Sequence, residues 1–158
     1  MAQFNFAEAA LAKGGLYEDG VALPPFSLDM RLRFDPFAVE IGQIALVDGE
    51  THLAAKGQIF AAPEGWRVAF EASVDQIETA RLLEMWPTAV KPRSRTWVSE
   101  NVTGGRLTDA RVDVRARQGE KPVIAASYEF SDATVRFMRT MPLMQGAVGM
   151  GVLQDNRM

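Results

Sequence analysis

The amino-acid sequence predicts a mainly β protein, built as an antiparallel, twisted or curled sheet with two short inserted helices. Apolar and polar residues alternate over most of the chain, as in strands that bury one face. The alternation gives way to a helical period only in residues 75–104. With 158 residues, 47% of them apolar and 23% charged, the chain is long enough to bury a core. We expect one β-rich domain over residues 1–158, divided into a first meander (1–74), a helical insert (75–104) and a second meander (105–158).

The first meander contains the clearest alternation, in residues 27–34. The apolar phase continues into the next strand and slips after Ile41, which predicts a β-bulge at Gly42. Asp48-Gly49 predicts a two-residue type I′ turn, because both central positions of that turn need a positive φ. Residues 53–59 and 66–74 then form the returning strands of the meander.

The helical insert is expected to contain helices at about 75–86 and 92–102. Asp75 is a candidate N-cap and Glu78 its capping-box partner, while Pro87 ends the first helix. Pro92 suits the first turn of the second helix, and Gly104 with the glycine after it is a typical C-terminal signal.

The second meander returns to strands, with alternation in residues 110–116 and further strands at 123–130, 134–138 and 146–153. Residues 129–137 resemble residues 33–41. If the two are equivalent, one strand–turn–strand unit is used twice, as in a repeat-built sheet.

Composition and motifs favour a non-catalytic domain. The net charge of −3 argues against nucleic acid as a partner, and without cysteine there is neither a disulfide nor a thiolate metal site. His52 is the only histidine, so no Ser-His-Asp arrangement can be built without it. It is predicted to be a surface residue on the polar side of its strand. Acidic pairs lie at turns, and no glycine-rich phosphate loop is present. We therefore predict no catalytic residue, no metal site and no cofactor.

One face of the meanders must leave water, because its apolar residues alternate with charged ones. Two short helices cover only part of such a sheet, so the sheet either curls on itself or keeps an open apolar remainder. An open remainder suits acyl chains, since burial stabilises by about 0.8 kcal/mol per CH₂. The predicted acyl-chain lining consists of Leu28, Met30, Leu32, Val39, Ile41, Val112 and Val114.

The insert also carries a short pattern: a helix ending in Leu-x-x-Trp-Pro, a spacer, Arg-x-Trp-Val-x-x-Asn, and a glycine before the next strand. Its positions here are Trp86, Pro87, Arg95, Trp97, Asn101 and Gly105. This pattern resembles that of AsmA-like envelope proteins of the YhdP type. From the residues themselves, we expect both tryptophans to pack the insert onto the sheet.

The resemblance implies a β-sheet folded into an open-groove or taco-like meander in the periplasm, within a protein anchored in the inner membrane. It also implies phospholipid transport between membranes and an effect on outer-membrane permeability. The expected partners are phospholipid acyl chains and flanking repeats of the same, larger protein. The alternative is a structural or protein-interaction β-domain whose apolar face is fully buried.

Overall fold

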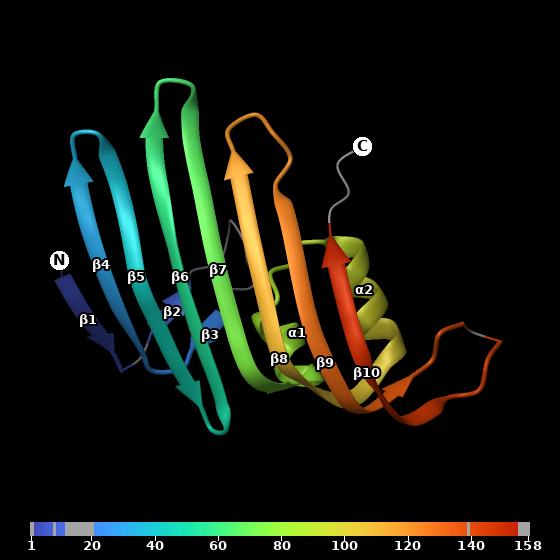
Figure 1. Ribbon diagram of the computed structural model, residues 1–158. Helices are drawn as coiled ribbons and strands as arrows, with labels where there is room; N and C mark the ends of the chain where they lie inside the picture. The colour runs from blue at the N-terminus through green and yellow to red at the C-terminus, as the bar shows by residue number, and fades with distance from the viewer. Residues whose placement is uncertain (1, 8, 12–20, 139, 155–158) are drawn as a thin grey trace.

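The computed structural model describes residues 2–7, 9–11, 21–138 and 140–154, and these form one large open sheet with two helices on one side (Figure 1). The sheet has eight antiparallel strands in the order β1-β4-β5-β6-β7-β8-β9-β10, and β2 pairs only with β3. The elements are β1 (Ala2–Phe6), β2 (Ala9–Leu11), β3 (Val21–Leu23), β4 (Phe26–Phe34), β5 (Phe37–Asp48), β6 (Thr51–Ala62), β7 (Gly65–Glu78), α1 (Thr79–Met85), α2 (Pro92–Asn101), β8 (Val102–Arg117), β9 (Val123–Val135) and β10 (Met144–Gln154). The mainly β, antiparallel prediction with two inserted helices is confirmed.

The bulge predicted at Gly42 is present. Met30 pairs with Ile41 on one side of β5, whereas Asp29 pairs with Gln43, so β5 contains one extra residue at this point. The pairing of β5 with β6 shows the same extra residue between Ile41 and Ile44. The bulge restores the apolar phase of β5 to the face that its neighbours use.

The β5–β6 turn lies one residue later than predicted. Asp48 pairs with Thr51, so the two turn residues are Gly49 and Glu50. Only Gly49 of these has a positive φ, at 60°. A positive φ at the first central position alone is the pattern of a type II′ turn, and the type I′ prediction is wrong.

The first helix starts later than the sequence signals indicated. Residues 75–78 continue β7, and residues 76–78 pair with β8, with Ile77 opposite Leu107 and Glu78 opposite Arg106. Glu78 occupies the N-cap of α1 but makes no side-chain capping bond. The second helix ends at Asn101, and Gly104 already belongs to β8. Pairing with β8 therefore outweighs the local capping signal.

The internal similarity does not correspond to a repeated structural unit. Residues 33–41 span the turn between β4 and β5, whereas most of residues 129–137 lie within the single strand β9. A separate strand at 134–138 is likewise absent, because β9 runs without a break to Val135. Asp132, with φ 52°, forms a bulge inside β9 instead of a turn.

The sheet is a single layer over much of its area. The accessible surface is 11054 Å², whereas a compact monomer of 17.4 kDa is expected to expose about 7,900 Å². Among the described residues no large side chain is fully buried, and the apolar core is limited to small or isolated positions. These are Ala38, Leu46, Ile77, Ala133 and Val135.

Candidate ligand-binding face

Strand register brings the apolar positions of six strands onto one face. Leu28 of β4 pairs with Ile44, Ile44 with Ala55, Ala55 with Ala72 and Ala72 with Val112. Residues directly opposite each other in antiparallel strands share a face, so this row crosses the sheet on one side. Two parallel rows are Met30-Ile41-Gly57-Phe70-Val114-Ile124 and Leu32-Val39-Ile59-Val68-Ala116. We call the surface formed by these three rows the apolar face.

All seven residues predicted to line an acyl-chain groove lie on the apolar face, in three adjacent rows. They come from the neighbouring strands β4 and β5 and from β8, and β6 and β7 lie between β5 and β8 in the sheet. Their shared face follows from the register, and their contact with a ligand stays a prediction.

The apolar face extends to aromatic residues that sequence reasoning missed. On β1, Phe4 pairs with Leu28 and Phe6 with Phe26. The rings of Phe6 and Phe26 stack with centroids 4.6 Å apart. Phe4 and Phe6 alternate with Gln3 and Asn5, and this short period-two pattern is the signal that would have revealed them.

Three glycines provide space for aromatic rings of neighbouring strands. An added Cβ at Gly57 would lie 2.6 Å from the Phe70 ring and 2.6 Å from the Ala69 carbonyl oxygen. At the β9–β10 edge, Gly149 has the Phe130 ring in the same position, and Gly151 has the Tyr128 ring there. Rings lying over glycine cover the exposed backbone and keep the surface flat and apolar.

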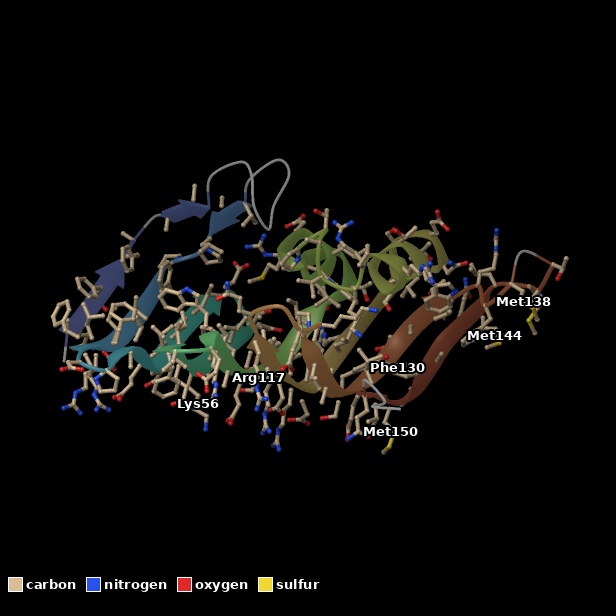
Figure 2. All side chains as sticks on the ribbon, turned by 90° about the horizontal axis from the view of Figure 1, so that it is seen from above. Lys56, Arg117, Phe130, Met138, Met144 and Met150 are labelled. Carbon is tan, nitrogen blue, oxygen red and sulfur yellow. The ribbon has the colours of Figure 1, made fainter. Side chains whose placement is uncertain are left out.

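The helices cover only one end of this side of the sheet (Figure 2). Beneath them Ile77 is 3% exposed, and Thr79, the first residue of α1, is buried as well. Away from the helices, Leu32 is 43% exposed and Val112 36%. Trp66 is also exposed, and its ring meets that of Phe37 edge-on, with the ring centroids 5.7 Å apart. The apolar face is thus covered by the helices at one end, while Leu32 and Val112 stay partly exposed away from them, and the β2–β3 pair lies on the same side of the sheet (Figure 2).

The opposite face of the sheet is polar, and Lys56 and Arg117 point away from the helices there (Figure 2). Lys56 forms an ion pair with Glu71 at 2.8 Å directly across the strands. His52 lies exposed on this face, as predicted, with its Nδ1 2.6 Å from Asp75 Oδ2. The backbone N–H of His52 donates to Asp75 Oδ1, and this bond is the main cause that lowers the pKa of the Asp75 carboxyl.

Three residues of the insert pattern, Trp86, Pro87 and Arg95, connect the helices to each other. The Arg95 guanidinium donates to the carbonyl oxygens of Trp86, at 3.0 Å, and Leu83, at 3.1 Å, at the C-terminal end of α1. The Trp86 indole N–H donates to the Val90 carbonyl at 2.7 Å. The Pro87 carbonyl accepts from the Val90 N–H, which closes the turn between the helices. These contacts satisfy carbonyl groups that a helix end leaves unpaired.

Gly105 allows β8 to approach β9 closely. Its φ is +114°, and an added Cβ would lie 2.7 Å from Ala133 Cα. The Gly105 carbonyl accepts a hydrogen bond from the Thr79 hydroxyl at 2.9 Å. Thr79 was not predicted, because its partner lies 26 residues away in the chain.

Trp97 does not pack the insert onto the sheet as expected. Its side chain is 41% exposed, and its ring lies 6.2 Å from that of Phe137. Asn101 acts locally: its side-chain amide donates to the Trp97 carbonyl, and its own carbonyl accepts from the Arg136 N–H. The pattern residues thus organise the insert and its junction with β9, while Trp97 stays at the surface.

Within the described residues, no group of three or more His, Cys, Asp or Glu side chains is placed to hold a metal ion. In the same part of the chain, no helix is long and apolar enough to cross a membrane. No protein-family model, curated protein or solved structure matches the chain. Fold and site together define an open antiparallel β-sheet protein with one partly covered apolar face.

Proposed function

We propose that the chain is a non-catalytic lipid-binding segment of an AsmA-like periplasmic protein. In this proposal, the apolar face holds phospholipid acyl chains, within an inner-membrane-anchored protein that moves phospholipid between membranes and maintains outer-membrane permeability. The observation that carries the binding function is the open part of the apolar face. The periplasmic setting rests on the insert pattern, from Trp86 to Gly105, alone.

The dimensions of the face support a flexible apolar ligand. Three rows of side chains run side by side across the sheet from β4 to β8, and none of them contains a charged residue. A continuous apolar area of this kind on a protein surface marks an interaction site. Acyl chains suit it because they bury CH₂ groups without needing hydrogen-bond partners at fixed positions.

The test is retention of phospholipid by the purified chain, measured by native mass spectrometry and by fluorescence of a phospholipid with a nitrobenzoxadiazole-labelled acyl chain. We expect Val112→Asp and Leu32→Asp to abolish binding while the chain still folds. Both side chains are partly exposed, so a carboxylate there reaches water when no lipid is bound.

Ser73→Asp is the matched control. Ser73 lies in the strand beside Val112 but on the polar face, where it pairs with Arg111. It should bind lipid like the unmodified chain. Absence of lipid uptake by the unmodified chain would contradict acyl-chain binding, and failure of both apolar-face variants to fold would show that the face acts as an ordinary core. The structural or protein-interaction alternative, in which protein covers the face, would then hold.

A further inference from the structure

The outer edge of β10 is an unpaired strand with an unusual sequence. Within the described residues, β10 is the last strand of the sheet, and nothing pairs with its far side. Residues 144–154 contain neither a charged residue nor proline. Exposed edges usually carry such residues, or are short or bulged, because a free edge otherwise pairs with another strand.

Three apolar side chains of β10 stand on the polar face of the sheet. Val148, Met150 and Val152 are each 76% exposed. Met150 pairs with Glu129 and Val152 with Ser127, and Met150 points away from the helices (Figure 2). This stripe is therefore separate from the apolar face, and acyl-chain binding on that face leaves it unexplained.

The centre of β10 is palindromic: residues 148–152 read Val-Gly-Met-Gly-Val. An antiparallel pair of identical strands has a two-fold axis, so each residue on one side of the axis meets its mirror position in the second copy. With the axis at Met150, Val148 lies opposite Val152 of the second copy, and the two methionines face each other. On the other side of the strand, Gly149 meets Gly151, so β10 itself contributes no bulky side chain at these positions.

We propose that two copies of this chain associate through their β10 edges in this antiparallel register, forming one continuous sheet. In the proposed pair, residues 147–153 of the two copies form the hydrogen-bonded ladder. This stretch of β10 contains no bulge, because the irregularity of β10 lies before it, at Gly146, whose φ is 65°. Directly opposed residues share a face, so the apolar faces of both copies lie on the same side of the joined sheet. The proposal is independent of what the apolar face binds.

The opposite edge of the sheet does not offer the same interface. β1 has five residues, and its side chains on the polar face of the sheet belong to the polar residues Gln3 and Asn5. A single strand pair lies at the small end of specific interfaces, below about 1,200 Å². We therefore expect a monomer–dimer equilibrium that depends on protein concentration.

Cysteine cross-linking tests the register, since the natural chain has no cysteine. In the proposed dimer, Met150→Cys places two thiols on directly opposed residues, whose Cα atoms are about 4.5–5.5 Å apart, within disulfide range. Met144→Cys is the control on the same strand. The two copies of that position lie about 40 Å apart, at about 3.4 Å per residue. Mild oxidation should give covalent dimer with the first variant and not with the second.

A mixture gives an independent reading of the register. Val148→Cys and Val152→Cys should each give no disulfide-linked dimer alone and form a disulfide-linked heterodimer when mixed, because only the mixture places cysteines opposite each other. Equal cross-linking of Met150→Cys and Met144→Cys, or absence of the mixed product, would overturn the proposed interface.

Charge variants test the same pairing without a covalent bond. In Val148→Lys/Val152→Glu, each lysine meets a glutamate of the second copy, whereas Val148→Lys/Val152→Lys opposes like charges. Sedimentation velocity at several concentrations should show a dimer dissociation constant on the order of tenfold higher for the Lys/Lys variant. Equal dissociation constants, or a natural chain that stays monomeric at several hundred micromolar, would refute dimerisation through β10.

Discussion

Individual glycines in this sheet are distinguished by what lies next to them. Gly57 is enclosed by the Ala69 carbonyl oxygen and the Phe70 ring, both within 2.6 Å of an added Cβ. At Gly42 the nearest atom would be 3.8 Å away, and its φ is not in the left-handed region. From the sequence, Gly42 was predicted to be a bulge and Gly57 an ordinary position within a strand. Only the neighbouring strand shows which one is required.

We expect Gly57→Ala to destabilise the chain by about 1–3 kcal/mol, because the methyl group meets a backbone carbonyl that cannot move aside cheaply. Gly42→Ala, the control, should change the free energy of unfolding by less than about 1 kcal/mol, since its Cβ makes only ordinary van der Waals contacts with Asp29 and alanine loses less backbone entropy on folding than glycine. Urea unfolding of both variants measures the difference. Equal effects would mean that the β6–β7 spacing is less rigid than the contacts at Gly57 indicate.

At the scale of elements, the short helices depend on contacts with each other more than on their own sequence. α1 has seven residues, no side-chain N-cap bond and no acidic residue in its first turn. A helix of this length is marginal without tertiary support. The support comes from Arg95, whose two hydrogen bonds reach the C-terminal carbonyls of α1.

Arg95→Met should therefore loosen the insert, with a loss of about 1–3 kcal/mol in stability, because the Leu83 and Trp86 carbonyls lose their donor. Arg93→Met on the same helix is the control. The Arg93 side chain is exposed and makes no hydrogen bond or ion pair with the described residues. Thermal unfolding and amide exchange of residues 79–85 measure the effect. Similar results for the two variants would show that the hydrogen bonds of Arg95 contribute nothing to stability.

At the scale of the whole molecule, the open single layer buries less surface than a compact protein of the same length. The slope of unfolding free energy against urea concentration scales with the surface that unfolding exposes. We therefore expect an m-value below that of compact domains of about 158 residues. Equilibrium urea unfolding, followed by both far-ultraviolet circular dichroism and tryptophan fluorescence, measures it. An m-value typical of a compact domain would show that the sheet closes on itself in solution.

The sequence alone determined which residues share a face of the sheet. Alternation is a local property of extended backbone, and Leu28, Leu32 and Val112 could be assigned to one face without any knowledge of their partners. The same reasoning predicted the bulge at Gly42, because a slip in apolar phase has no other local explanation in a strand. Fold class and most of the candidate site follow from these patterns.

Only the tertiary structure decided where elements end and which faces stay open. Residues 75–78 carry helix-capping signals, yet they extend β7 because β8 offers them backbone partners from far along the chain. The pairing of His52 with Asp75 and the ring of Phe70 over Gly57 arise in the same way, from neighbours in the sheet that sequence does not reveal. How much of the apolar face the helices cover also depends on packing, since no local pattern states where a seven-residue helix will lie.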